Sequence, residues 1–371
     1  MVNHRSAEHL QFQAVAREFM TTRFPDERTR ELMLDERGFD EATWRAMASQ
    51  LGLLGLTIPE EYGGSGYTSV ELGIVLEEMG RCLAGTPYFG TVVLAVNAIL
   101  ESGDQQAAAQ LLPGIAGGNV RASLAVLEPG TRWERPVITS TAVPASDHWR
   151  INGNKSFVLD GLIADLVIVV ARTARGIGLF SINAPADGMT IRAMGALDQT
   201  RKLADMSFID TPATPLGSDT EGWRTVTRVL ELAAIALAAE QVGGAQRCLD
   251  MAVEYSKSRI QFGRPIGSFQ AIKHSCADTL VRVELARSAA YHAARCAAGR
   301  TPDLPAMANL VHTCCSDAYL AAAKVNIQVH GGIGVTWEHP AHRYFKRAKS
   351  SQLLFGDPSF HRERLAVKVG I

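Results

Sequence analysis

The chain has 371 residues, of which 47% are hydrophobic and 20% are charged, and its formal net charge is −1. This length and hydrophobic share are sufficient for a large buried core in two or three domains. Without a basic excess, we expect neither a nucleic acid nor an anionic membrane surface as a partner. Residues 342–347 are locally basic, which suits either a solvated helix face or a phosphate contact.

The six cysteines include no CxxC pair, and the adjacent Cys314 and Cys315 have poor geometry for a disulfide. Cys248, Cys276 and Cys296 lie in alanine-rich helical stretches, which predicts buried free thiols and a reducing compartment. Histidine and cysteine show no zinc-like spacing, so no metal is expected.

The N-terminal residues 1–9 lack the apolar core of a signal peptide. The longest apolar runs, such as residues 233–239, are too short to span a bilayer. These two features predict a cytoplasmic protein without a membrane segment.

The chain is predicted to be helical over residues 1–120, β-rich over 121–215 and helical again over 216–371. In the first part, apolar residues recur at helical spacing over 7–21, 40–51 and 69–79. In the second, short β-like runs occupy 122–127, 149–151, 157–159, 166–171 and 178–183, with turns at 151–154 and 160–161. In the third, long helical stretches cover 226–259, 269–298 and 305–330, which we expect to pack as an antiparallel bundle.

Five segments in this order resemble the motifs of the acyl-CoA dehydrogenase family. They are 58–64 (IPEEYGG), 127–130 (LEPG), 151–155 (INGNK) with 164–165 (AD), 259–270 (RIQFGRPIGSFQ) and 328–336 (QVHGGIGVT). The resemblance covers nearly the whole chain. It implies an α+β fold with an N-terminal helical domain, a middle β-barrel or sandwich and a C-terminal four-helix bundle.

The resemblance also implies FAD, held between the β domain and the bundle, with its pyrophosphate and adenine reaching a neighbouring subunit. Arg259 is then expected to pair with the pyrophosphate, because a guanidinium offers a fixed fork of donors. Phe262 and Gln270 would line the adenosine end. The set Gln328, Gly331 and Gly332 would approach the dinucleotide from the partner chain, where glycine lets the backbone come close to an anion.

Each of these residues has a simpler interpretation when it is taken alone. Arg259 suits the negative end of a helix dipole, Gly331 and Gly332 suit a helix stop, and His330 suits a helix cap. Their joint spacing is what favours the cofactor site.

The family reaction removes two neighbouring hydrogens from an acyl-CoA thioester: a glutamate takes the α-proton and the flavin accepts the β-hydride. Phe355 and Ala233 occupy the two positions at which the family carries that glutamate, and neither side chain accepts a proton. Asp357 has a shorter side chain, two residues beyond Phe355.

Two glutamates lie near Ala233 in the sequence. Glu231 projects roughly 200° around the helix from Ala233, and Glu240 lies on nearly the same face but about 10 Å along the axis. Glu240 is therefore the remaining candidate base, with a structural ion pair to an arginine as the alternative.

Two further departures concern the flavin ring. Leu127 and Leu159 stand where the family places threonine hydroxyls, and each lost hydrogen bond is worth about 1 kcal/mol. The resemblance therefore implies the partner subunit of a heterotetramer that uses electron-transferring flavoprotein as its electron acceptor, with a self-sufficient homotetramer as the alternative. A flavin-free scaffold protein and a flavin monooxygenase or nitroalkane-type oxidase on the same fold remain open.

Overall fold

The computed structural model describes residues 5–133, 137–146 and 148–371. Residues 1–4, which belong to the N-terminal segment used above to predict the location, lie outside the described residues. Contacts divide the chain into two compact units. Unit 1 comprises Met1–Arg30, Ser69–Ala84 and Ala234–Ile371, and unit 2 comprises Glu31–Thr68 and Gly85–Ala233. This division does not test the predicted domain boundaries at residues 120 and 215, which stay a prediction.

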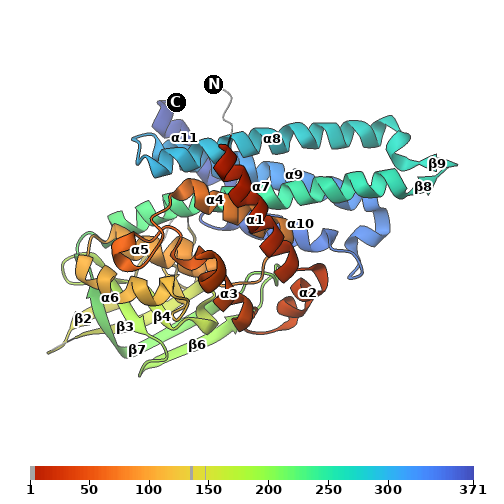
Figure 1. Ribbon diagram of the computed structural model, residues 1–371. Coiled ribbons are helices and arrows are strands. Elements are labelled where there is room, and N and C mark those ends of the chain that lie inside the picture. The colour runs from red at the N-terminus through yellow and green to blue at the C-terminus, as the bar shows by residue number, and fades with distance from the viewer. Residues whose placement is uncertain (1–4, 134–136, 147) are drawn as a thin grey trace. The chain divides into compact units, whose positions relative to one another are not determined.

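Unit 1 is helical. It contains α1 (Ala7–Arg23), α4 (Ser69–Cys82), β8 (Ile260–Gln261), β9 (Arg264–Pro265), η5 (Ile266–Ser268), α8 (Gln270–Ala298), α9 (Leu304–His330), η6 (Gly331–Val335), α10 (Ala341–Leu353) and α11 (Pro358–Val369). Helices α2 (Asp26–Leu34) and α7 (Gly222–Ser258) belong partly to each unit. The long helices α7 and α8 form a hairpin with the small β8–β9 ribbon at its tip (Figure 1).

The three long helices begin and end within four residues of their predicted bounds, because their stop signals are strong. Pro305 lies in the first turn of α9, where its missing N–H leaves no bond unmade. Helix α9 ends at Gly331, which has φ 65°. Helices α10 and α11 were not predicted individually.

Helices α4 and α7 touch backbone to backbone in unit 1. A Cβ atom added to Gly80 would lie 2.0 Å from the carbonyl oxygen of Glu240, and one added to Gly243 would lie 1.8 Å from that of Glu77. Only glycine permits this approach at either position. The buried Glu77 side chain pairs with Arg5 and Arg287, so the same contact also ties the N-terminal segment and α8 to α4.

Unit 2 combines helices with a β-barrel. Its helical elements are α3 (Glu41–Leu51), η1 (Leu53–Gly55), η2 (Glu60–Tyr62), the π-helical η3 (Phe89–Ala95), α5 (Val96–Glu101), α6 (Gln105–Ala116) and η4 (Gly161–Ile163). Its strands are β1 (Ala122–Ala125), β2 (Thr141–Pro144), β3 (Trp149–Leu159), β4 (Leu166–Arg172), β5 (Ile177–Asn183), β6 (Met189–Met194) and β7 (Leu203–Leu216).

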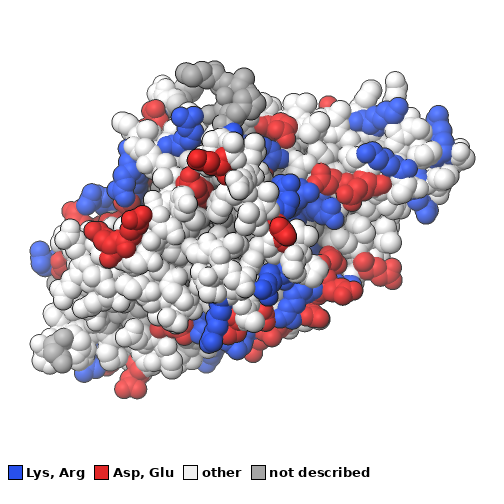
Figure 2. All heavy atoms as spheres, viewed as in Figure 1, with Lys and Arg blue, Asp and Glu red and all other residues white. Residues whose placement is uncertain are grey.

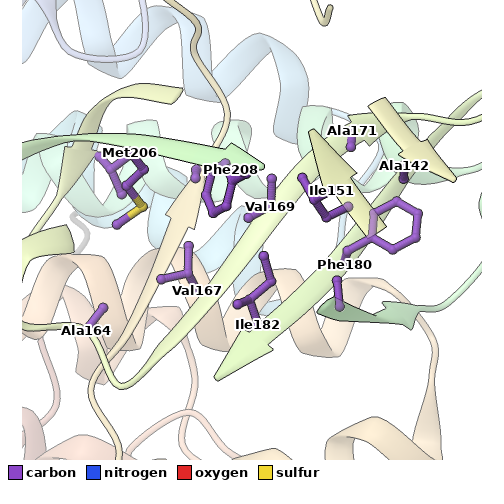
Figure 3. Packing of buried hydrophobic residues seen from close by; sticks show 13 residues of the cluster. Ala142, Ile151, Ala164, Val167, Val169, Ala171, Phe180, Ile182, Met206 and Phe208 are labelled. Atoms are coloured by element: carbon purple, nitrogen blue, oxygen red, sulfur yellow. The ribbon is translucent and has the colours of Figure 1, made fainter. Parts of the chain in front are cut away.

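The strand order is β1-β4-β2-β3-β7-β5, with β6 beside β7, and β5 pairs with β4 as well. The ring β4-β2-β3-β7-β5 therefore closes on itself. Alternate side chains of these strands fill the interior, as Figure 3 shows for Val167 and Val169 of β4 beside their cross-strand partners Ile182 and Phe180 of β5. Burial of these apolar side chains is the main stabilising contribution to the barrel.

The turn predicted at residues 151–154 is wrong. The runs 149–151 and 157–159 belong to a single strand, β3, which passes straight through this segment. The Asn-Gly signal marks an irregularity instead: the pairing of β3 with β7 shifts between Ile151 and Gly153, and Gly153 has φ 142°. Glycine adopts positive φ in tight turns and in some bulges alike, so the residue type alone does not separate the two. Strands β2, β6 and β7 were not predicted.

Two of the family-like segments meet in a buried ion pair. Lys155 Nζ of β3 lies 2.8 Å from Glu128 Oε1, and both side chains are almost completely excluded from solvent. The amides of Thr139 and Ser140 donate to the same carboxylate at 2.8 and 2.9 Å. Burial opposes the charge on Glu128, but these donors outweigh it and lower its pKa to about 2. Burial also lowers the pKa of Lys155, to about 8, against the raising effect of Glu128.

Replacing Lys155 with methionine is expected to destabilise the protein by about 3–5 kcal/mol, because Glu128 then remains buried without its counter-charge. Urea unfolding followed by tryptophan fluorescence measures this. The double variant Lys155→Met/Glu128→Gln should recover much of the loss, and the exposed Lys257→Met is the control. A loss below about 1 kcal/mol for Lys155→Met would contradict the assigned role.

Candidate functional site

Three of the predicted cofactor residues lie at the tip of the α7–α8 hairpin. Arg259 follows the last residue of α7, Phe262 lies between β8 and β9, and Gln270 begins α8. All three are exposed, and Phe262 is 90% accessible to solvent. Its ring meets Phe269 edge-on at 6.0 Å between centroids. An aromatic side chain held this far into solvent is available to a ligand or a second chain.

The backbone of Arg259 is fixed while its side chain is unengaged. Its amide donates to the carbonyl of Tyr255 at 2.8 Å, and its carbonyl accepts from the amide of Ile266 at 2.9 Å. Within the described part of the chain, its guanidinium makes no hydrogen bond or ion pair. The guanidinium therefore extends from a hydrogen-bonded backbone, and no carboxylate of the described residues neutralises its charge.

The other three predicted cofactor residues lie at the end of α9. Gln328, Gly331 and Gly332 are all exposed. A Cβ atom added to either glycine would meet no heavy atom within 4 Å, so open space surrounds both. The backbone here is accessible to a bulky group.

The two groups of residues approach each other within one chain. The ring of His330 stacks on Tyr255 at 4.3 Å and on His339 at 4.1 Å. Its Nδ1 donates to the carbonyl of Asn326 at 2.8 Å. Since Tyr255 lies one turn before Arg259, this stack brings the end of α9 to the end of α7. His330 therefore packs between two rings, and its bond to the carbonyl of Asn326 is of the kind that a helix cap makes.

Among the described residues, each carboxylate near the two predicted base positions has a hydrogen-bond or ion-pair partner. Phe355 is 4% exposed and Ala233 is fully buried. Asp357 accepts from the amide of Phe360 at 2.8 Å as the N-cap of α11. Glu240 accepts from Arg347 at 3.1 Å in a buried ion pair. That pair favours the structural alternative for Glu240.

The predicted basic stretch at residues 342–347 is largely internal. Arg343 pairs with Asp26 and Arg347 with Glu240, and both arginines are buried. Neither a solvated face nor a phosphate contact describes these two side chains. On the face drawn in Figure 2, lysine and arginine are interspersed with aspartate and glutamate.

A cavity of about 410 Å³ lies in unit 2 between α5 and the first turns of α7. Its lining is charged and polar: Glu101, Arg224, Thr225, Thr227, Arg228 and Glu231. Arg228 lies 3.7 Å from Glu231, which is therefore a wall of this cavity and not a free base. Such a lining suits a polar group better than an acyl chain.

The two leucines that stand where the family places threonine hydroxyls near the flavin ring are buried in unit 2. Leu127 and Leu159 are both almost completely excluded from solvent. No group of three or more potential ligands among the described residues could hold a metal ion. In the same residues, no helix combines the length and apolar character needed to cross a bilayer.

Comparison with known families identifies the class of protein. Sequence models of the acyl-CoA dehydrogenase N-terminal, middle and C-terminal domains match residues 6–119, 123–210 and 220–370. The chain is 38% identical to acyl-CoA dehydrogenase IpdE2 of Mycobacterium tuberculosis over 342 residues, which cover 92% of this chain and 90% of that protein. The chain therefore belongs to the acyl-CoA dehydrogenase family.

Solved structures agree with this assignment. A variant of the Tcur3481-Tcur3483 steroid ACAD superimposes with a TM-score of 0.88 at 33% identity and covers 98% of each chain. The ChsE4-ChsE5 complex from Mycobacterium tuberculosis gives a TM-score of 0.90 at 26% identity and covers 100% of this chain and 99% of that one. The predicted fold class and the predicted enzyme class, an acyl-CoA dehydrogenase acting on CH–CH bonds, are confirmed. Members of this family typically bind FAD.

Two histidines that the sequence does not single out contact the turn that carries Phe355. His312 of α9 and His361 of α11 are buried and stack at 3.9 Å between ring centroids. Burial lowers the pKa of His312 to about 4, and burial with the neighbouring His312 lowers that of His361 to about 3. A lone histidine in a helical stretch carries no spacing signal, so the sequence could not single them out.

Acidification from pH 7 to pH 5 is expected to destabilise the protein by about 2 kcal/mol through His312 alone. The unfolded chain binds a proton at this residue near its ordinary pKa of 6.5, whereas the folded chain does not until about pH 4. The loss therefore grows as the pH falls between these values. Glu128 does not add to this loss of stability between pH 7 and pH 5. Its pKa is lowered from an ordinary value of 4.5, so the stability that it contributes is lost below that pH.

Urea midpoints measured from pH 7 to pH 5 test this expectation. The variant His312→Gln keeps an N–H donor without a titrating ring, so its stability should fall about 2 kcal/mol less than that of the wild type. The exposed His274→Gln should match the wild type. Equal pH dependence in all three proteins would contradict the prediction.

Proposed function

We propose that this chain is the base-lacking subunit of a heteromeric acyl-CoA dehydrogenase that acts on a steroid side-chain acyl-CoA. The observation that carries this proposal is Phe355, a buried aromatic ring at the position where the family carries a glutamate. The second family position is Ala233, also buried and also inert. The chain thus keeps the family fold without the group that removes the substrate proton.

The nearby carboxylates support this interpretation, because each of them already has a hydrogen-bond or ion-pair partner. Proton transfer needs an acceptor whose lone pair is free to reach the substrate. Asp357 caps α11 and Glu240 pairs with Arg347 inside the bundle. Releasing either one would leave unpaired helix donors or a buried arginine. We therefore assign proton abstraction to a carboxylate of a related partner subunit.

The residues at the ends of α7 and α9 fit the dinucleotide end of FAD. Arg259 offers an unneutralised fork of donors for the pyrophosphate, and the open space at Gly331 and Gly332 admits a bulky anion close to the backbone. Phe262 offers an exposed ring for stacking, with Gln270 and Gln328 as amide donors and acceptors beside it. Since both helix ends lie together in one chain, we infer that they contact one nucleotide from the same side.

The division of labour follows from these groups. Bound FAD supplies the acceptor for the β-hydride. Arg259 and the two glycines hold the charged middle of the dinucleotide, and the hydrogen bond from Ile266, which follows the β8–β9 ribbon, fixes the backbone of Arg259. Phe355 fills apolar space beside the acyl chain and excludes water from it. Electron-transferring flavoprotein is the proposed electron acceptor of the complex.

The steroid substrate and the partner are proposed from the similar proteins. One of them is described as a steroid ACAD made of Tcur3481 and Tcur3483, and another is the ChsE4-ChsE5 complex. Each of these names pairs two chains, and a second chain could supply the base that this chain is proposed to lack. A flavin-free scaffold is the alternative outcome of the experiment below.

The direct test is expression of this chain alone and together with a related acyl-CoA dehydrogenase subunit that carries the glutamate. We expect stoichiometric flavin and turnover of a steroid side-chain acyl-CoA in the co-purified complex, and no turnover in this chain alone. Full turnover by a homo-oligomer would overturn the heteromeric assignment. A colourless complex that retains both chains would identify a scaffold.

Replacing Arg259 with alanine is expected to weaken FAD binding by the complex about ten- to hundredfold, because a charge-assisted hydrogen bond is lost. Lys257→Ala removes an exposed cation from the same helix end and should bind FAD like the wild type. Flavin retention during dialysis and titration of the apo-complex measure the difference. Equal retention in the two variants would exclude Arg259 from the cofactor site.

The variant Phe355→Leu is expected to keep kcat of the complex within about tenfold of the wild type, because the ring accepts no proton. Loss of a general base costs a factor of about 100 to 10,000. Steady-state kinetics with saturating acyl-CoA distinguish these outcomes. A loss of the larger size, with normal flavin content, would give Phe355 a role in the chemical step that the proposal denies.

A further inference from the structure

The turn between α10 and α11 is held by two histidines from different helices. His312 Nε2 lies 2.9 Å from the carbonyl oxygen of Leu354, and His361 Nε2 lies 3.2 Å from that of Phe355. Carbonyl oxygens only accept, so each ring nitrogen donates its N–H. Two successive carbonyls on either side of the Phe355 Cα are therefore fixed by two stacked rings.

The backbone of this turn has an unusual conformation. Phe355 has φ 66°, in the left-handed region that non-glycine residues rarely adopt. Gly356 follows with φ 112°, and a Cβ atom there would lie 2.4 Å from the ring of Phe360 and 3.2 Å from His361 Nε2. A strained residue of this kind persists only where its surroundings determine it. The two histidine contacts are surroundings of that kind.

We propose that His312 and His361 are positioning residues, which clamp the carbonyls of Leu354 and Phe355 and so set where residue 355 lies relative to the acyl chain. The clamp itself follows from the contacts of this turn. Its importance for the substrate rests on the proposed function, which places residue 355 at the family base position. The ring at 355 then acts as a wall of fixed position.

His361 has an acceptor at each ring nitrogen. Its Nδ1 lies 2.8 Å from Asn309 Oδ1, while the amide nitrogen of Asn309 donates to the carbonyl of Pro305 at 2.5 Å. Burial lowers the pKa of His361, so at neutral pH the ring has one N–H for two acceptors. The charged groups that influence the two rings are Asp317 of α9, Asp357 of the turn and Arg364 of α11.

This arrangement gives a matched set of variants at one position. Glutamine places an amide donor near the position of Nε2 and keeps the donation to the carbonyl of Phe355, whereas asparagine places its amide near the position of Nδ1, beside Asn309, and loses that donation. Leucine removes both. The clamp predicts that His361→Gln behaves like the wild type and that His361→Asn behaves like His361→Leu.

The first measurement is hydrogen–deuterium exchange of the purified chain at neutral pH, read on peptides that cover the 354–357 turn. We expect exchange in the Asn and Leu variants about fivefold faster than in the wild type, as loss of one hydrogen bond implies. Exchange in the middle of α8 should stay unchanged. Equal protection in Asn and Gln variants, or a loss that extends through α8, would overturn the clamp.

The second measurement uses the flavin-loaded complex with its partner subunit. A displaced wall weakens substrate binding without removing a reacting group, so the Asn variant should raise KM while kcat changes less than KM does. The Gln variant should restore both values. If the wild-type complex shows no turnover, the proposed function fails while the exchange result still decides whether the clamp exists. A fall in kcat with unchanged KM would contradict the positioning role.

Discussion

The structure of unit 1 depends on the contact between α4 and α7 at Gly80 and Gly243, where two helix backbones touch. Side chains of any size would push the helices apart and break the register in which Glu77 meets Arg5 and Arg287. The part of α7 that belongs to unit 1 is thereby held against α4. The middle of α7 carries the Glu240–Arg347 pair, and its C-terminal end carries Tyr255 and leads to the exposed Arg259. The position of the candidate cofactor residues follows from this packing.

In the proposed function, holding the cofactor and removing the proton are separate tasks, and this chain is proposed to retain only the means for the first. The proposed cofactor residues are exposed, and Arg259 among them has a backbone fixed by hydrogen bonds and a guanidinium without an ion pair in the described part of the chain, which suits recognition of an anion. At the family's base position, this chain carries the buried ring of Phe355, on the turn between α10 and α11. A heteromeric enzyme can tolerate this loss, because one carboxylate per flavin is sufficient for the reaction. Under the proposed function, the ring of Phe355 replaces a charged, hydrated carboxylate with an apolar surface, which suits a bulky apolar acyl group.

Much of the fold could be predicted because its signals are local. The long helices show regular apolar spacing and end at glycine or proline, and the motif segments are specific in their order. Strand β3 was divided in the prediction because Gly153 suits a turn and a bulge equally well. The pairing of Lys155 with Glu128 and the clamp of His312 and His361 could not be predicted, since each joins residues far apart in sequence without a spacing rule. From the motifs, the residues at the end of α9 were expected to approach the dinucleotide from a partner chain. The stacking of Tyr255 on His330, which brings the ends of α7 and α9 together within one chain, carries no sequence signature.

The central claim is that this chain lacks a base of its own, and exchange of the substrate α-proton with solvent deuterium tests it most directly. The saturated acyl-CoA is incubated anaerobically in deuterated buffer with this chain alone and with the complex, and deuterium at C2 is measured by mass spectrometry. The account predicts exchange in the complex and only the uncatalysed rate with this chain alone. Exchange by the isolated chain at the rate of the complex would show that it carries a working base and would contradict the account.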